Sequence, residues 1–71
     1  MNFVFISSHP TAAQAVRRDV LEAMRDKPAA TLERIADRVK WQDSRVRNAL
    51  EGMQRDGLVR CDEDGKWRIR G

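Results

Sequence analysis

Arginine makes up most of the basic residues of this chain, and its chemistry is the first indication of what the chain can bind. Lysine and arginine together number 14 against 11 acidic residues, which gives a formal net charge of +3. A guanidinium donates two parallel hydrogen bonds to a phosphate or to the edge of guanine, a geometry that lysine does not match. Because the basic excess is mild, composition alone does not decide for or against nucleic-acid binding.

A run of polar side chains follows Trp41 and is interrupted only by Val46. Arginine can bond the O6 and N7 atoms of guanine together, and asparagine can do the same for N6 and N7 of adenine. Serine and glutamine suit contacts to phosphates or bases. These residue types could read DNA bases if one element presented them together: Gln42, Asp43, Ser44, Arg45, Arg47 and Asn48.

The sequence offers little for catalysis or for holding a metal. His9 is the only histidine and Cys61 the only cysteine, and no glycine-rich phosphate loop or nucleophile–base pair is present. One cysteine excludes a disulfide within the chain and a Cys/His metal site. We expect no enzyme activity, metal or cofactor, with Cys61 a small, reduced apolar residue.

No apolar run approaches the roughly 18 residues of a membrane span, so a cytoplasmic protein is expected.

Helical periodicity predicts the elements that position the polar run. Thr11 and Gln14 have the spacing of a capping box and begin a helix that extends to about Arg25, before the Pro28 break. Thr31 caps a second, shorter helix, and a third begins near Asp43 and stops at Asp56-Gly57. The third helix, residues 43–55, has the buried face Val46, Ala49, Leu50 and Met53.

After Gly57 the pattern changes to alternation. Residues 58–61 and 66–70 predict two strands, joined by a turn that ends in Asp64-Gly65. Alternation turns Trp67 and Ile69 inward and leaves the basic side chains outward. The expected fold is α+β, mostly α: three helices followed by a two-stranded hairpin, with residues 11–71 as one domain and residues 1–10 as an arm or short strand.

The ordered set of residues from 31 to 59 resembles the winged helix-turn-helix superfamily of bacterial transcription regulators. The matching features are an Ile-Ala pair in the second helix, Ser-x-Val at the start of the third, a leucine four residues later, and a closing Asp-Gly-Leu-Val: Ile35-Ala36, Ser44 and Val46, Leu50, and 56–59. Two positions depart from the pattern. Lys40 replaces a small residue in the inter-helix turn, and Trp41 replaces leucine or valine, with its ring expected to fill the core.

The resemblance implies that helix 43–55 enters the DNA major groove and that the hairpin is the wing. Arg45, Arg47 and Asn48 are then the base-reading candidates, and basic residues outside this helix neutralise phosphates. The complete set of expected DNA-binding residues is Gln42, Asp43, Ser44, Arg45, Arg47, Asn48, Arg38, Lys40, Lys66 and Arg68. The function implied is a DNA-binding regulator of transcription without a ligand of its own.

The sequence leaves several alternatives open. Asp62, Glu63 and Asp64 would put three negative charges at the hairpin tip, which predicts repulsion from phosphates and suits docking on a polymerase or another regulator instead. Structured RNA is a further possible ligand. The apolar residues Phe3–Ile6 are either an edge strand, an arm packed on the body, or part of a homodimer contact together with the first helix.

Overall fold

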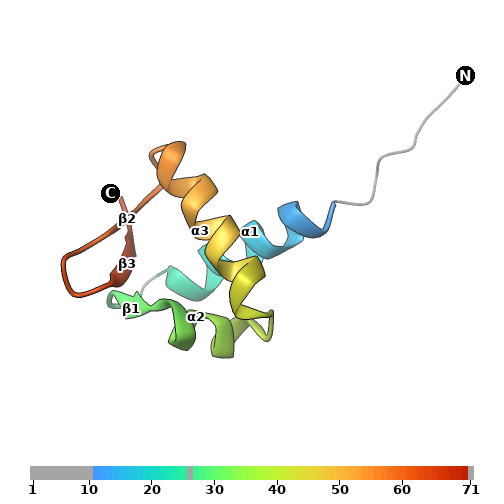
Figure 1. Ribbon diagram of the computed structural model, residues 1–71, viewed down its shortest axis with the longest axis horizontal. Coiled ribbons are helices and arrows are strands. Elements are labelled where there is room, and N and C mark those ends of the chain that lie inside the picture. Colours follow the sequence, from blue (N-terminus) through green and yellow to red (C-terminus); the bar gives the residue numbers. More distant parts are fainter. Residues whose placement is uncertain (1–10, 26, 71) are drawn as a thin grey trace, which may run out of the picture.

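The computed structural model describes residues 11–25 and 27–70, so the expected arm over residues 1–10 lies outside the described residues. In chain order the elements are α1 (Ala12–Met24), β1 (Ala30–Thr31), α2 (Leu32–Val39), α3 (Asp43–Arg55), β2 (Val59–Cys61) and β3 (Lys66–Ile69). Figure 1 shows the three helices packed together, with the sheet at one end of the group. The described part is therefore mostly helical with one small antiparallel sheet, as the sequence predicts.

The predicted caps form at the starts of α1 and α2. The backbone N–H of Gln14 donates to Thr11 Oγ1 at 3.2 Å, and the Thr11 N–H donates to Gln14 Oε1 at 3.0 Å, which completes the capping box. At α2 the Arg34 N–H donates to Thr31 Oγ1 at 3.3 Å. These side-chain oxygens satisfy amide groups that have no partner within the helix, so both helices begin where the sequence places them.

The turn between α2 and α3 depends on Lys40. This residue adopts the left-handed conformation, with φ 62° and ψ 31°, and its N–H donates to the Ala36 carbonyl at 2.8 Å. That conformation is less favourable by about 1–2 kcal/mol for a residue with a Cβ, which explains why a small residue is usual at such a position. The turn is thus the tight one that the sequence predicts, with lysine in a strained position.

Trp41 fixes this turn to α1. Its ring packs against the core but is only half-buried, whereas the sequence predicts that it fills the core, and its Nε1–H donates to Asp19 Oδ2 at 2.8 Å. Because this bond joins residues far apart in sequence, it fixes the position of the start of α3 relative to α1.

The sheet has three strands, in the order β1-β3-β2, and all neighbours are antiparallel. The predicted two-stranded hairpin is therefore incomplete, because β1 adds to β3 with Ala30 opposite Trp67 and Thr31 opposite Lys66. A strand of two residues has no periodicity to recognise and forms only because β3 offers it a partner. The hairpin turn is as expected, with Gly65 at φ 78°.

The core lies where the three helices and the sheet meet. Its fully buried side chains are Ile35, Leu50, Met53, Val16, Val20, Val46 and Val59. Trp67 and Ile69 share the face of the sheet that carries the buried Val59, as predicted, but Trp67 is half-buried and Ile69 is 38% exposed. Its cross-strand neighbour Val59, at 1% exposed, occupies the core position, which leaves Ile69 at the margin of the sheet.

Over the described ranges, 11–25 and 27–70, none of the helices combines the length and the apolar character needed to cross a membrane.

Candidate nucleic-acid interface

α3 is amphipathic, and its polar side lies at the surface of the molecule. Residues along a helix are separated by about 100° of rotation, so the buried side of α3 defines an opposite, outer face. The inner side packs on α1 and α2. The outer face of α3 consists of exposed residues only: Ser44, Arg47, Asn48, Glu51 and Arg55.

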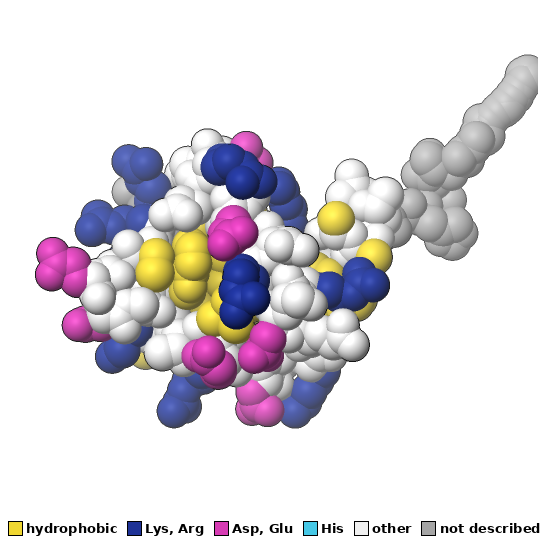
Figure 2. All heavy atoms as spheres, in the orientation of Figure 1, with side chains coloured by type: hydrophobic (Ala, Val, Ile, Leu, Met, Phe, Trp, Pro, Cys, Tyr) yellow, Lys and Arg dark blue, Asp and Glu magenta, His cyan; other side chains and the backbone are white. Residues whose placement is uncertain are grey.

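The outer face carries both charges and amides. Figure 2 shows basic and acidic side chains next to one another over α3. Glu51 stands four residues from both Arg47 and Arg55, the spacing at which helix ion pairs form, yet no ion pair joins them in the described part of the chain. The hydrogen-bonding groups of this face are therefore available to a ligand. Glu51 was not among the predicted site residues, although its spacing from Arg47 in the sequence places it on the same face.

Gln42 and Asp43 mark the beginning of α3. Gln42 is the N-cap residue and is exposed, and its side chain makes no capping bond. Asp43 is also exposed and lies in the first helical turn, where its negative charge is favourable for the helix dipole. Both residues flank the outer face at its N-terminal end, as predicted.

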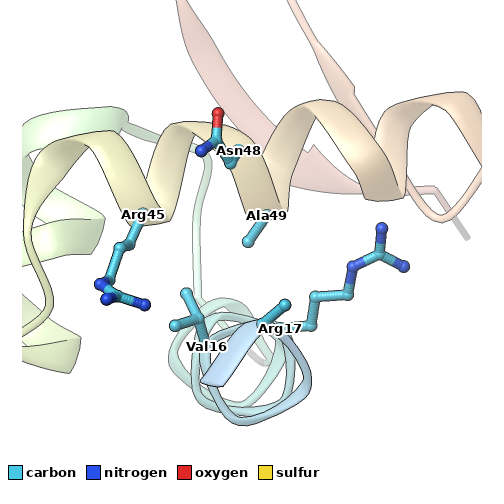
Figure 3. Close-up of a pocket in the computed structure, with 6 residues that line it drawn as sticks. Val16, Arg17, Arg45, Asn48 and Ala49 are labelled. Carbon is cyan, nitrogen blue, oxygen red and sulfur yellow. The ribbon is translucent and has the colours of Figure 1, made fainter. Parts of the chain in front are cut away.

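Arg45 differs from its neighbours, because it extends from α3 toward α1. Its guanidinium carbon lies 5.8 Å from the centre of the Trp41 ring, within the range of a cation–π contact. Figure 3 shows this direction, with Asn48 pointing away from α1. Arg45 remains exposed, but the structure places it on the α1 flank rather than with Arg47 on the outer face.

Arg17, which is not among the predicted site residues, forms the other wall of a pocket between α1 and α3. The pocket has an apolar floor that includes Val16 and Ala49, with Arg45 on one side and Arg17 on the other (Figure 3). Arg17 Nη1 pairs with Asp56 Oδ2 at 3.1 Å. A Cβ at Gly52 would collide with the Arg17 guanidinium, so the glycine lets this side chain lie across α3. A glycine in mid-helix was the only sequence signal for this contact.

Arg38 and Lys40 do not join the outer face of α3. Arg38 lines a groove between α1 and α2, together with Asp19 and Glu22. Lys40 is exposed in the turn, with its Nζ 3.8 Å from Asp37 Oδ1. Their closeness to α3 in sequence suggested a shared surface, but the rotation of α2 turns Arg38 toward α1.

The hairpin carries a second basic surface on the face of the sheet away from the core. Arg60 lies directly opposite Arg68, and alternation places Lys66 and Arg70 on the same face. We call these four residues the basic row. Like charges opposite each other across two strands repel, which an anion bound to this face would relieve. Lys66 and Arg68, both predicted site residues, are exposed there.

One of the three acidic residues at the hairpin tip, Asp62, is bound by its own hairpin. Its carboxylate accepts from the N–H groups of Asp64 and Lys66, at 2.9 and 3.0 Å, and from Arg68 Nη2 at 3.1 Å. The Lys66 bond contributes most to lowering the pKa of Asp62 below its usual value. Burial opposes it, and the Arg68 and Asp64 bonds lower the pKa further. Asp62 therefore stays ionised but its charge is paired with Arg68, whereas Glu63 and Asp64 are exposed at the tip.

Comparison of the chain with protein-family models, with curated proteins and with solved structures gave no match.

Proposed function

We propose that this chain is a winged helix-turn-helix protein that binds double-stranded DNA through α3 and regulates transcription. The observation that carries the proposal is the outer face of α3, where a guanidinium and an amide point outward from a helix whose other side is locked in the core. The order of elements supports it: two helices joined by a tight left-handed turn, then a hairpin.

The dimensions and chemistry of the outer face suit the major groove, which is about 12 Å wide and admits one helix. Arg47 offers the two donors that guanine requires, and Asn48 offers the donor and acceptor that adenine requires. Ser44 and Gln42, near the start of α3, suit phosphate or base contacts. Asp43 lies closest to the N-terminus of α3. Because its carboxylate accepts hydrogen bonds and carries a negative charge, it suits contacts to bases with exocyclic amino groups rather than to phosphates.

Phosphate contacts come from residues that flank α3 on two sides. Arg45 and Arg17, on the α1 flank, carry positive charge beside the outer face. The basic row provides Lys66 and Arg68 on the hairpin, although Arg68 shares its charge with Asp62. Glu63 and Asp64 keep the hairpin tip away from the DNA backbone. Arg38 and Lys40 lie outside this arrangement and contribute little to it.

Selection of bound sequences from a pool of random DNA duplexes tests the proposal. The wild-type protein should enrich a short motif, and Asn48→Ala should bind the pool but lose the preference for adenine at one position of that motif. Arg18→Ala is the matched control, because Arg18 is an exposed arginine of α1 that does not line the pocket beside α3. Enrichment of no motif, with no duplex retained above background, would overturn the proposal.

A further inference from the structure

Apolar side chains form the floor of the pocket between α1 and α3. Val16 is 1% exposed and Ala49 is 6% exposed, and the exposed Ala13 also lines the pocket. The volume of the pocket is about 150 Å³. An apolar cavity of about 150 Å³ is large enough to hold one benzene ring. The pocket therefore has room for a ligand with a single ring that contacts α1 and α3 together.

Arginines stand on two sides of this floor, and contacts within the fold hold both of them. The Arg45 guanidinium carbon lies 5.8 Å from the centre of the Trp41 ring. Arg17 crosses α3 at Gly52 and pairs with Asp56 at 3.1 Å. Figure 3 shows the two arginine side chains on opposite sides of the floor. Because both are already oriented, binding a ligand between them costs little side-chain entropy.

The charged groups that line the pocket are guanidiniums, and no carboxylate of the described ranges lines it with them. Arg45 is also absent from the ion pairs found in the described part of the chain, so its N–H groups are available to a ligand. A guanidinium donates two parallel hydrogen bonds to a carboxylate and also stacks on the face of an aromatic ring. The floor and the walls therefore complement a flat apolar ring that carries a negative charge.

We propose that the pocket between α1 and α3 binds a small aromatic carboxylate, with its ring on the apolar floor and its carboxylate paired with Arg45. The sequence predicts a regulator without a ligand of its own, and this site gives the domain one. Binding of the carboxylate does not require DNA. A second part rests on the proposed function: Arg45 and Arg17 contact phosphates there, so a bound carboxylate occupies the same donors and weakens duplex binding.

Titration of the isotope-labelled protein with benzoate, followed by nuclear magnetic resonance, tests the site without DNA. Benzoate has the ring and the charge, acetate has the charge alone, and benzamide has the ring without the charge. A ligand of the size of benzoate should bind with a dissociation constant on the order of 1 mM. Acetate and benzamide should each bind more weakly by roughly tenfold or more. The amide signals that move should be those of the pocket residues on α1 and α3 and not those of the hairpin.

Two pairs of variants separate the pocket from general effects of charge and side-chain size. Ala13→Leu fills the pocket from its exposed side, whereas Ala12→Leu makes the same change at an exposed residue that does not line it. Arg45→Gln removes a charge from the pocket wall, and Arg18→Gln removes one from an exposed arginine of α1 outside the pocket. Ala13→Leu and Arg45→Gln should each raise the benzoate dissociation constant by roughly tenfold or more, and the other two should match the wild type. Circular dichroism checks that the variants stay folded, since all four positions lie outside the core.

Fluorescence anisotropy of a DNA duplex tests the second part, with chloride exchanged for benzoate at constant ionic strength. Benzoate at about ten times its dissociation constant should raise the apparent dissociation constant of the duplex about tenfold for the wild type, because the two ligands exclude each other. The duplex affinity of Ala13→Leu should change little on the same addition.

Benzoate that binds no more tightly than acetate or benzamide, or that binds Ala13→Leu as well as the wild type, would overturn the site. A wild type that binds both benzoate and duplex, with the same duplex affinity in either buffer, would overturn the competition. A protein that binds no duplex would remove the proposed function and the competition with it, while the titration still decides the site.

Discussion

Replacing Gly52 with alanine changes two opposing free energies, and the structure predicts how they combine. A glycine inside a helix is less favourable than alanine by about 0.8–1.0 kcal/mol, so the substitution alone should stabilise α3. The new Cβ, however, would collide with the Arg17 guanidinium. Because that group is the end of a flexible side chain, it can move away, but only by leaving Asp56.

The loss of the Arg17–Asp56 pair sets the size of the opposing effect. The pair spans 3.1 Å, and its side chains are 40% and 56% exposed. Such a solvent-screened ion pair contributes about 0.2–1 kcal/mol. Gly52→Ala should therefore change the free energy of unfolding by between about −0.2 and about +0.8 kcal/mol in the wild type, and should raise it by the full value of about 0.8–1.0 kcal/mol in Arg17→Ala.

Urea unfolding of the wild type, the two single variants and the double variant measures this difference. The double-mutant cycle should give a coupling of about 0.2–1 kcal/mol between Gly52 and Arg17. Additive effects within error would refute the proposed reason for the glycine. A destabilisation by Gly52→Ala of more than about 1 kcal/mol would also refute it, because it would mean that Arg17 cannot move away.

Three further predictions concern the turn, its anchor and the hairpin. Lys40→Gly should raise the free energy of unfolding by about 0.5–1 kcal/mol, because relief of the left-handed strain exceeds the entropy cost of glycine; a lower melting temperature would contradict this. Trp41→Phe should lower the free energy of unfolding by about 1–2 kcal/mol in urea, because it leaves the Asp19 carboxylate without its 2.8 Å donor; Asp19→Asn in the Trp41→Phe background should then change little. The folded pKa of Asp62 is below the ordinary value of 3.8, so its ionised form stabilises the fold above that pH and the contribution is lost as pH falls through the folded pKa. The stability difference between wild type and Asp62→Asn should accordingly be constant near neutral pH and shrink in acid melts, and a difference that grows in acid would exclude the Asp62 hydrogen bonds as its source.

The helices and their caps could be predicted from the sequence, because each depends on residues close together in the chain. The capping box of Thr11 and Gln14, the Thr31 cap and the apolar face of α3 all follow from local spacing. The tight turn at Lys40 was expected for the same reason, since it lies between two periodic segments.

What the sequence could not predict depends on contacts between distant residues. β1 exists only through pairing with β3, more than 30 positions later. The direction of Arg45 is set by the Trp41 ring and the nearby surface of α1, and the role of Gly52 by Arg17. Within the candidate interface, the outward positions of Arg47 and Asn48 could be predicted from helical periodicity. The separation of Arg45 and Arg38 from these two residues depends on how three helices pack, so it could not be predicted from the sequence.

The most direct test of the account is the affinity of the protein for a DNA duplex, measured by fluorescence anisotropy at several salt concentrations. The affinity of the wild type should fall steeply with salt, as expected for phosphate contacts. Arg47→Ala should weaken binding to a selected sequence by about 1–3 kcal/mol, and Arg18→Ala should bind as the wild type does. Equal affinities for Arg47→Ala and the wild type, or no salt-dependent binding at all, would contradict the claim that the outer face of α3 binds DNA.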